Sequence, residues 1–400
     1  MNRITQCMHG RGTVSGVMRH RHKPQAEVPG NFLAFSENYR PVVFWNLTNR
    51  CNLSCTHCYS KSGPGKTAVC ELTTAEALKV IDDLADMGVP LILFTGGEPL
   101  MRKDIWELAQ YAGNRGLRMA LSTNGTLITP DIARRIKESG IEYAGISLDG
   151  ARAETHDRFR NSPGAFGQTL NAFAACREAD LRCGVRVTLT KENCRELEAL
   201  VDLSLSLGAS RFCLYWLVPT GRGSDSYARL QLDRNEVTPA LDLLYRKAKE
   251  TDPAAMEFLT VDAPQDAIHL LASMEKDGSE DLADARRLLE SLKGGCSAGT
   301  RVANIDAQGN VYPCQFARSP EFLAGNIRDR PFSGIWSDGT NPVLAQFRNK
   351  DARFGGRCGA CSYRDLCGGG CRVRAHAADG DFLAEDPFCF LGTDNSGDPG

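Results

Sequence analysis

Three cysteines stand close together in the segment Cys51-Asn-Leu-Ser-Cys55-Thr-His-Cys58-Tyr59, which follows the apolar run Pro41-Val-Val-Phe-Trp-Asn-Leu-Thr48. The apolar run predicts a strand, so the three thiols fall in the loop after it and can converge on one side. Three thiolates suit an iron-sulfur cluster, which normally takes four cysteine ligands. A metal with a vacant position can bind and activate a small molecule.

Two simpler interpretations of these cysteines are a zinc site completed by His57 and three thiols buried as small apolar groups. Zinc sites usually combine a C-x2-C pair with a distant second pair. A ligand at His57 would also crowd its neighbours Cys55 and Cys58. The spacing therefore favours a cluster.

Strand-like and helix-like patterns alternate from residue 41 to about residue 223. Each connection is long enough for a helix, which predicts a parallel sheet, and right-handed crossovers curl such a sheet into a partial (β/α)6 TIM-like barrel of the α/β class. The predicted strands span residues 42–46, 91–95, 119–122, 143–147, 185–190 and 212–218. The predicted helices span residues 74–87, 103–115, 130–139, 166–179 and 194–207.

Polar and glycine-rich clusters follow the first four predicted strands. After the cysteine segment come Thr95-Gly-Gly-Glu-Pro99, Ser122-Thr-Asn-Gly125 and Ser147-Leu-Asp-Gly150. Each is an ordinary turn sequence when taken alone. Ligands of parallel sheets bind at the carboxyl ends of the strands, so the order of these clusters predicts one shared binding site.

The C-x3-C-x2-C spacing with a following aromatic residue resembles the signature of the radical SAM enzymes. In that family the vacant iron of a 4Fe-4S cluster chelates S-adenosyl-L-methionine, and an electron from the cluster cleaves it to methionine and a 5'-deoxyadenosyl radical. The resemblance implies that Cys51, Cys55 and Cys58 hold this cluster.

The same resemblance implies a set of cofactor contacts. The segment from Thr95 to Pro99 looks like the Gly-Gly-Glu-Pro motif of the family, in which glycines let the backbone approach the methionine ammonium. Adenine is expected against apolar groups near Val187 and Leu217. The implied contacts are Gly96, Gly97, Glu98, Ser122, Asn124, Ser147, Arg160 and Leu217. No catalytic acid or base can be assigned from the sequence.

Seven cysteines recur in the last quarter of the chain, at Cys296, Cys314, Cys358, Cys361, Cys367, Cys371 and Cys389. Zinc knuckles are the simpler interpretation, but seven ligands do not divide into closed four-ligand zinc sites. Iron-sulfur clusters tolerate an open position. The spacing resembles the SPASM extension of radical SAM enzymes, which implies two auxiliary 4Fe-4S clusters.

By this resemblance, one auxiliary cluster is held by Cys358, Cys361, Cys367 and Cys389. The other is held by Cys296, Cys314 and Cys371, with its last position open or taken by a non-cysteine group or the substrate. Val302 stands where a peptide-modifying relative has a further cysteine. The auxiliary clusters either accept an electron from a substrate radical or bind substrate, and the sequence does not separate these roles.

The bulk composition describes a chain long enough for two domains, with 400 residues, 42% hydrophobic and 24% charged. A net charge of −2 argues against a nucleic-acid or membrane partner. The start of the chain lacks an apolar signal core, and sixteen cysteines are typical of metal ligands and reduced thiols, so we expect a cytoplasmic protein.

The predicted organisation has four parts: a basic N-terminal arm (1–40), the radical SAM core (41–223), a helical bridge (224–295) and the cysteine-rich SPASM domain (296–400). The arm is expected to be irregular and partly ordered. Its His9, His20 and His22, with neighbouring basic residues, are an alternative heme-type or carboxylate-binding group. The bridge is expected to be helical and charged, with helices over 239–249 and 281–292.

Several segments resemble those of radical SAM enzymes of alternative heme synthesis, namely 32–36, 41–48, 212–223, 313–316 and 371–375. The arm and the Val-Pro-Thr-Gly-Arg-Gly segment that ends at Gly223 are most similar to the branch that removes two acetates from 12,18-didecarboxysiroheme, giving iron-coproporphyrin III. This resemblance implies a tetrapyrrole substrate and an electron donor such as ferredoxin or flavodoxin. Arg222, Arg372, Arg374 and the arm are candidate partners for substrate carboxylates, or else ordinary surface and cluster-loop groups.

Three alternatives follow from the same residues. A sister enzyme of d-type heme synthesis acts on propionates of the same substrate. A SPASM enzyme that modifies a ribosomal peptide is the second alternative. The third is an electron-transfer protein, which would not need the Gly-Gly-Glu-Pro pocket.

Overall fold

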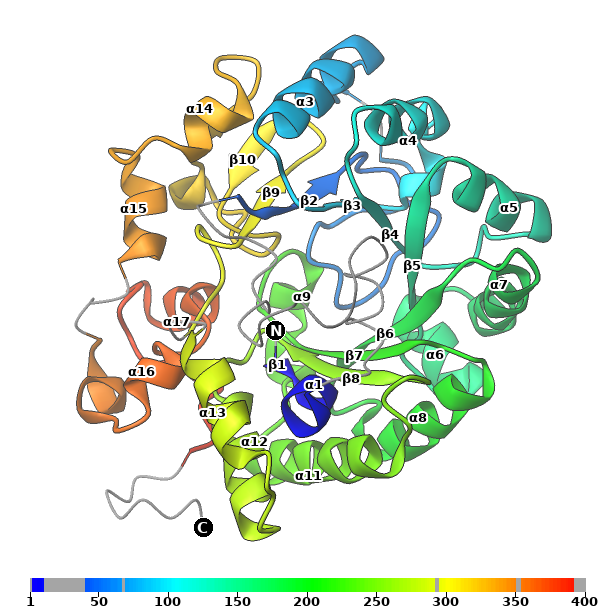
Figure 1. Cartoon of the computed structure of the whole chain (residues 1–400). Helices are drawn as coiled ribbons and strands as arrows, with labels where there is room; N and C mark the ends of the chain where they lie inside the picture. The colour runs from blue at the N-terminus through cyan, green and yellow to red at the C-terminus, as the bar shows by residue number, and fades with distance from the viewer. Residues whose placement is uncertain (1, 11–39, 67–68, 292–294, 350–353, 392–400) are drawn as a thin grey trace.

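One curved sheet organises the protein. The computed structural model describes residues 2–10, 40–66, 69–291, 295–349 and 354–391. Within this part of the chain, eleven strands pair in the order β1-β8-β7-β6-β5-β4-β3-β2-β9-β10-β11. The sheet bends into an open barrel with helices along its outer side (Figure 1). The predicted α/β class and barrel-like fold are confirmed.

Strands β2 to β8 run parallel to one another. Their bounds are β2 Val42–Asn46, β3 Ile92–Thr95, β4 Met119–Thr123, β5 Ile141–Ser147, β6 Cys183–Leu189, β7 Arg211–Trp216 and β8 Glu257–Val261. Strands β2 to β7 correspond to the predicted strands. The fully buried β8 lies where only helices were expected, so the barrel has one more parallel strand than predicted.

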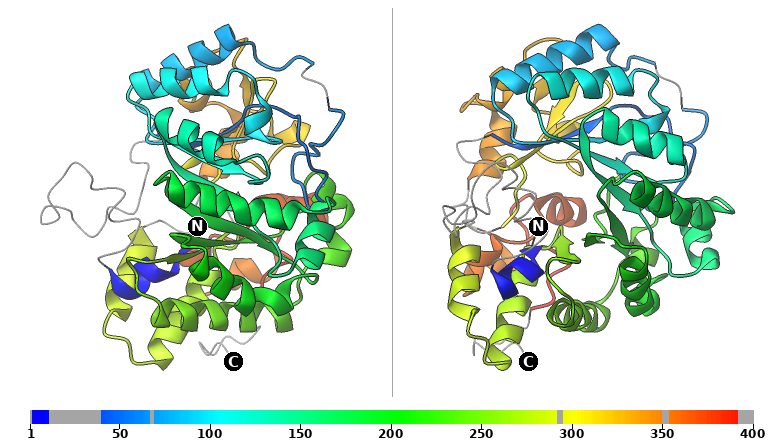
Figure 2. Two further views of the ribbon diagram at one scale, coloured as in Figure 1. Left: turned by 90° about the vertical axis from the view of Figure 1, so that its right-hand side faces the viewer. Right: turned by 45° about the vertical axis from the view of Figure 1, so that its right-hand side comes forward.

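The connections hold helices that pack against the outer face of the sheet. They are α3 Thr74–Asp86, α4 Ile105–Asn114, α5 Pro130–Glu138, α6 Ala153–Arg160, α7 Ala165–Glu178 and α8 Leu197–Ser206. Figure 2 shows this outer layer, coloured from blue through cyan to green, from two further sides. All except α6 lie close to predicted ranges. Thr73 caps α3 in a capping box with Glu76, which explains its sharp start.

The segment after β7 is also helical. It contains α9 Arg222–Asp225, α10 Tyr227–Leu230, α11 Arg234–Glu250, α12 Asp266–Lys276 and α13 Leu282–Ser291. No helix of the described residues has the length and apolar character needed to cross a membrane.

Residue alternation separates the two faces of the barrel wall. In β6, Val185 and Val187 are fully buried in the core between sheet and helices. Arg186 and Thr188, which alternate with them, line a pocket on the inner side of the barrel. Successive side chains of a strand point to opposite faces, so the polar residues of the strand face inward.

Segments from both ends of the chain extend the sheet. Strand β1 Asn2–Arg3 pairs antiparallel with β8 and leads into helix α1 Ile4–His9. The expectation of an irregular arm is therefore wrong for residues 2–9, because Ile4, Cys7 and Met8 form a buried helical stripe. The remaining predictions for the arm, including those for His20, His22 and residues 32–36, lie outside the described residues.

At the other edge, β9 Val302–Ile305 pairs parallel with β2, followed by the antiparallel strands β10 Asn310–Tyr312 and β11 Gly325–Asn326. The helices after them are α14 Phe332–Trp336, α15 Pro342–Arg348, α16 Arg364–Cys367 and α17 Arg372–Asp379. Helices α16 and α17 lie on the open side of the arc of strands, at the left of Figure 1. The cysteine-rich region thus shares its sheet with the barrel.

Candidate active site

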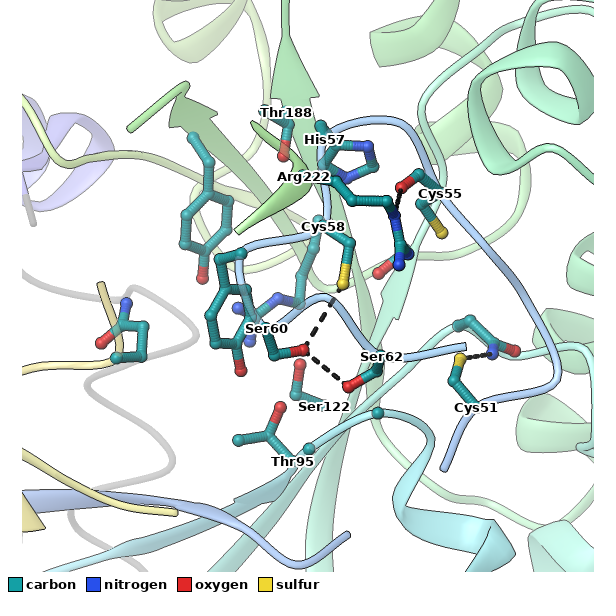
Figure 3. A pocket seen from close by; sticks show the side chains of 18 of the residues that line it. Cys51, Cys55, His57, Cys58, Ser60, Ser62, Thr95, Ser122, Thr188 and Arg222 are labelled. Carbon is teal, nitrogen blue, oxygen red and sulfur yellow. Dashed lines mark hydrogen bonds between the residues drawn. The ribbon is translucent and has the colours of Figure 1, made fainter. Parts of the chain in front are cut away.

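A pocket lies at the carboxyl ends of the parallel strands, where the sequence predicted a shared site. It encloses about 1030 Å³, open solvent included. All four predicted clusters contribute to its wall, through Cys51, Cys55, Cys58, Gly96, Gly97, Ser122, Asn124 and Ser147. Figure 3 shows Ser122 and Thr95 below the cysteine loop and Thr188 above it beside His57, and these three residues come from three different strands.

The cysteine loop is held by polar contacts to its thiols. The Leu53 amide donates to Cys51 Sγ at 3.4 Å, and the Asn124 side-chain amide lies 3.9 Å from the same sulfur. Arg160 Nη1 donates to Cys55 Sγ at 3.6 Å. These donors favour negative charge on the sulfurs.

The buried thiols fit a site for an iron-sulfur cluster. All sixteen cysteines lie in the described residues and are free. Burial is the main cause that raises the pKa of Cys51 to about 12, and burial also raises the pKa of Cys55. Thiolates in such surroundings need a strong positive charge nearby, which a metal cluster supplies.

His57, the residue that would complete a zinc site, packs against an aromatic ring. Among the described residues, no group of three His, Cys, Asp or Glu side chains is placed to hold a single metal ion. His57 stacks on Phe159, with ring centroids 4.2 Å apart, and its Nδ1 has no hydrogen-bond partner. Burial and the charge of Arg160 hold the pKa of His57 well below its ordinary value, so the ring is neutral.

Gly96 and Gly97 let strand β3 approach the cysteine loop. A Cβ atom on Gly97 would lie 2.1 Å from the Arg50 carbonyl oxygen, and one on Gly96 would lie 2.7 Å from that of Thr48. The amides of Gly97 and Glu98 donate to these same two carbonyls, at 2.7 and 2.8 Å. Only glycine permits this close backbone contact, which fixes the loop against the pocket.

Glu98 is fully buried behind the pocket wall rather than in it. Its carboxylate accepts hydrogen bonds from the Asn124 amide at 2.9 Å and from Thr123 Oγ1 at 2.8 Å. Burial raises its pKa to about 7. In this structure the side chain joins the ends of β3 and β4, and its contact with a methionine ammonium stays a prediction.

The other predicted cofactor contacts converge on the pocket. Ser122, Asn124, Ser147, Arg160 and Leu217 all line it. Val187, which was expected beside adenine, points to the helices and belongs to the main core instead.

Arg160 is held in place by a buried carboxylate. Its Nη2 pairs with Asp149, and Asp149 Oδ1 also accepts from the Thr188 amide at 2.7 Å. Burial raises the pKa of Asp149, and the neighbouring Arg160 opposes this. Arg160 Nε has no partner among the described residues, so the guanidinium retains a donor for a ligand.

Arg222 braces the cysteine loop from the other side. Its Nε donates to the Cys55 carbonyl at 2.8 Å, and its own amide donates to the Cys58 carbonyl at 2.8 Å. Gly221, with φ of +59°, permits this approach, because a Cβ there would lie 2.3 Å from the Cys58 carbonyl oxygen. Arg222 lines the pocket as well.

Charge interactions connect the C-terminal cysteines in two groups, whose assignment to two clusters stays a prediction. Burial, followed by the charges of Cys296 and Cys371, raises the pKa of Cys314 well above its ordinary value. The pKa of Cys367 is likewise raised by burial and then by Cys389 and Cys358. The charge of Cys361 contributes to raising the pKa of Cys358, which connects Cys361 with the second set. Mutual influence of this kind requires the thiols of each set to lie near one another.

A buried ion pair lies between these two sets. Arg374 donates to both carboxylate oxygens of Asp386, at 2.7 and 2.8 Å, and both side chains are buried. Asp386 Oδ2 also accepts from the Cys371 amide at 2.8 Å, and its backbone carbonyl accepts from the Cys389 amide at 2.9 Å. The pair therefore links one cysteine set to the other.

Of the two interpretations of Arg374, the structure favours a cluster-loop group over a partner for a substrate carboxylate. Its guanidinium donates to Asp386 and to the carbonyls of Leu217 and Asp262. Arg372 lies outside the pocket as well. It donates to the Phe382 and Ala384 carbonyls at 2.8 Å and lies over the Phe354 ring.

Sequence reasoning missed several polar or aromatic residues of the pocket, among them Arg186, Tyr215 and Gln315. Arg186 could have been predicted from the sequence, since a charged residue in an otherwise apolar inner strand must face the barrel interior. Gln315 directly follows Cys314, so it lies between the pocket and one C-terminal cysteine set.

Comparison with known proteins gives matches to two families. Residues 45–204 match the radical SAM superfamily, and residues 296–362 match the iron-sulfur cluster-binding domain called SPASM. Fe-coproporphyrin III synthase of Methanosarcina barkeri is 40% identical over 91% of this chain and 91% of its own length. AdoMet-dependent heme synthase of the same organism is 38% identical over 87% of this chain and 95% of its own.

Pre-heme d1 synthase of Dinoroseobacter shibae is 38% identical over 88% of this chain and 86% of its own length. Among solved structures, SuiB of Streptococcus suis bound to S-adenosylmethionine superposes with a TM-score of 0.67 at 18% identity, over 88% of this chain and 78% of that one. The shared fold extends through both the barrel and the cysteine-rich region.

Proposed function

The chain belongs to the radical SAM superfamily and carries a SPASM domain, and from this we propose that it removes two acetate side chains from 12,18-didecarboxysiroheme to give iron-coproporphyrin III. One observation carries the choice of reaction: the 40% identity to Fe-coproporphyrin III synthase covers 91% of both chains. The heme-pathway relatives together place the enzyme in alternative heme biosynthesis.

As a radical SAM enzyme, the protein uses a 4Fe-4S cluster and S-adenosyl-L-methionine, and its SPASM domain uses auxiliary iron-sulfur clusters. When bound, the cluster and cofactor supply the one-electron chemistry that takes a hydrogen atom from the substrate. We assign the first cluster to Cys51, Cys55 and Cys58, whose buried thiols and nearby donors support this.

The remaining residues of the pocket wall bind and orient the cofactor in this proposal. Ser147 and Arg160 face its carboxylate, since Arg160 keeps a free donor and a fixed position beside Cys55. Ser122 and Asn124 offer hydrogen bonds to ribose or to the methionine end. The backbone of Gly96 and Gly97 approaches the ammonium group, and Leu217 packs on adenine.

We assign one auxiliary cluster to Cys296, Cys314 and Cys371 and the other to Cys358, Cys361, Cys367 and Cys389. The last position of the first of these clusters is open to a non-cysteine group or to substrate. An external donor such as ferredoxin or flavodoxin supplies the electrons.

The test is an anaerobic assay. The protein is reconstituted with iron and sulfide and given S-adenosyl-L-methionine, reductant and didecarboxysiroheme, and the tetrapyrrole is followed by mass spectrometry. Loss of both acetates with formation of 5'-deoxyadenosine is the expected result. The C55S variant should form neither product, whereas C70S, at an exposed thiol outside the pocket, should react normally.

A second candidate is the d-type heme reaction at the propionates of the same substrate, which the 38% identity to pre-heme d1 synthase supports. The same assay separates the two, because loss of acetates and changes at propionates give different product masses. If 5'-deoxyadenosine forms while the tetrapyrrole stays unchanged, both heme reactions are excluded and a peptide substrate becomes the next test.

A further inference from the structure

Arg186 is a half-buried cation in the pocket and forms no ion pair with a carboxylate of the described residues. It lies at the middle of β6 and lines the pocket from the barrel side. Among the described residues, no carboxylate is within ion-pair distance of its guanidinium, and no hydrogen bond to the guanidinium is formed. By contrast, Arg160, Arg211 and Arg374 are paired with Asp149, Glu257 and Asp386.

The surroundings of Arg186 are built to hold it. Its guanidinium carbon lies 4.7 Å from the centroid of the Tyr215 ring, a favourable position for a cation over an aromatic face. A Cβ atom on Gly145 of the neighbouring strand would lie 2.7 Å from Arg186 Cδ. Gly145 therefore leaves the space across β5 in which the arginine side chain lies.

The groups that act most strongly on Arg186 through their charge are Tyr215, Cys213, Tyr143 and Tyr59. Burial raises the pKa of Tyr215 and Cys213 above their ordinary values, so these two groups are neutral at neutral pH. Among the described residues, Arg186 thus forms no ion pair with a carboxylate, although its charge opposes the rise that burial causes in the pKa of the more distant Asp262. A partly desolvated charge without an ion-pair partner is unfavourable, and a ligand anion in the pocket would supply that partner.

Tyr59 supplies a second donor beside this cation. The Asn304 amide donates to Asn46 Oδ1 at 2.6 Å and to the Phe44 carbonyl at 2.7 Å, and the Asn46 amide donates to Tyr59 Oη at 2.9 Å. Because Tyr59 Oη accepts in this chain, its own proton remains available to an acceptor in the pocket.

We propose that Arg186, with Tyr59 as the second donor, binds one carboxylate side chain of the substrate and so sets its position in the pocket. The forked guanidinium matches a carboxylate in two parallel hydrogen bonds, and the stacked Tyr215 fixes the plane of the fork. This proposal rests on the proposed function, because a tetrapyrrole substrate carries several such carboxylates. The cofactor has a different arginine, Arg160, on the cysteine side of the pocket.

The test measures tetrapyrrole binding and cofactor binding separately in the reconstituted protein. Iron-coproporphyrin III is titrated by its absorbance, and S-adenosyl-L-methionine by equilibrium dialysis. R186Q should weaken tetrapyrrole binding about 10- to 100-fold, the effect of losing a hydrogen bond to a charged group. R186K keeps the positive charge but lacks the forked guanidinium. R186K and Y59F should each lower tetrapyrrole affinity by a smaller factor, on the order of threefold to tenfold.

The matched control is R135Q. Arg135 also lies 4.7 Å from an aromatic ring centroid, that of Trp106, but on the outer surface. Tetrapyrrole binding should be unchanged in R135Q, and cofactor affinity should be unchanged in every variant. Unchanged tetrapyrrole binding in R186Q would overturn the proposal. So would an equal loss of cofactor binding in R186Q, because that would assign Arg186 to the cofactor.

A second measurement does not depend on the tetrapyrrole. Phenylglyoxal, which modifies unpaired guanidinium groups, should label Arg186, and citrate as a carboxylate probe should protect it, as read by peptide mass spectrometry. If the wild type binds no tetrapyrrole but citrate protects Arg186, the proposed function fails and the carboxylate site stands. Absence of labelling or of protection overturns the site itself.

Discussion

Asp149 is the residue that holds Arg160 in place for binding the cofactor. Arg160 is buried, and without Asp149 its charge would have no counter-charge beside it. Breaking a buried ion pair on one side costs about 3–5 kcal/mol. The D149N variant should therefore have a lower denaturation midpoint and bind S-adenosyl-L-methionine more weakly, as measured by chemical unfolding and equilibrium dialysis.

The control for D149N is E142Q, which removes the carboxylate of the partly exposed Arg118–Glu142 pair. That change should cost no more than about 1 kcal/mol, because solvent screens such pairs. Equal stability of D149N and the wild type would contradict the role assigned to Asp149.

Glu98 gives the protein a pH dependence that can be traced to one residue. Its pKa in the folded protein is about 7, against an ordinary 4.5, because of burial. Between these values the folded state keeps a proton that the unfolded chain has released, so the free energy of unfolding falls as pH rises through this window. The loss is about 3 kcal/mol at most and is complete above pH 7.

The E98Q variant should remove this part of the pH dependence. Denaturation midpoints measured from pH 5 to pH 8 should fall less steeply in E98Q than in the wild type. Parallel curves would show that Glu98 does not hold the extra proton. The comparison must be made between the two proteins, because Asp262 and Asp266, whose pKa burial also raises to about 7, contribute slopes of the same sign.

At the scale of elements, the contact between the end of β3 and the cysteine loop decides whether the pocket forms. G97A should displace the loop, because its Cβ would overlap the Arg50 carbonyl oxygen. We expect reduced iron content after reconstitution and loss of cofactor cleavage. The control G167A, a helix position with no atom within 4 Å of the added Cβ, should fold at least as well as the wild type. Normal iron content in G97A would contradict this account.

The elements that the sequence predicted are those with a long and regular pattern. Strands β2 to β7 and five of the outer helices repeat apolar residues at the spacing of their structure, and packing on one core enforces that pattern. Strand β8 was missed because Glu257–Val261 is a short run between charged helices. Helix α1 was missed because its stripe of Ile4, Cys7 and Met8 adjoins a basic segment that dominates the composition.

The residues of the candidate site also fall into those that the sequence predicts and those that only the structure reveals. Cysteines and the Gly-Gly-Glu-Pro segment could be found from spacing, since their chemistry depends on short-range order along the chain. The partners of Arg160, Arg186 and Arg374 could not, because each depends on residues brought together by the fold. Asp386, for example, lies twelve positions from Arg374 along the chain, and nothing in the sequence distinguishes this pair from a surface pair.

At the scale of the whole molecule, the cysteine-rich region should not be separable from the barrel. Strand β9 pairs with β2, whose Val43 and Trp45 are fully buried. A chain that ends after residue 291 would leave the edge of β2 unpaired and its core side uncovered. It should be recovered as aggregates, as judged by size-exclusion chromatography of the soluble fraction.

The control keeps the sheet and removes only cysteines. The double variant C358S/C367S retains β9 to β11 and should remain soluble with reduced iron content. A soluble, monodisperse chain ending at residue 291 would contradict the shared-sheet argument and favour an independent domain boundary there.

The two edges of the sheet also affect whether the protein aggregates before its iron-sulfur clusters are inserted. Each edge is formed by a two-residue strand, β1 at one side and β11 at the other. Such short edges are poor templates for adding a strand from another chain. The folded protein without its clusters should therefore resist edge-to-edge association. This resistance leaves time for the clusters to be inserted.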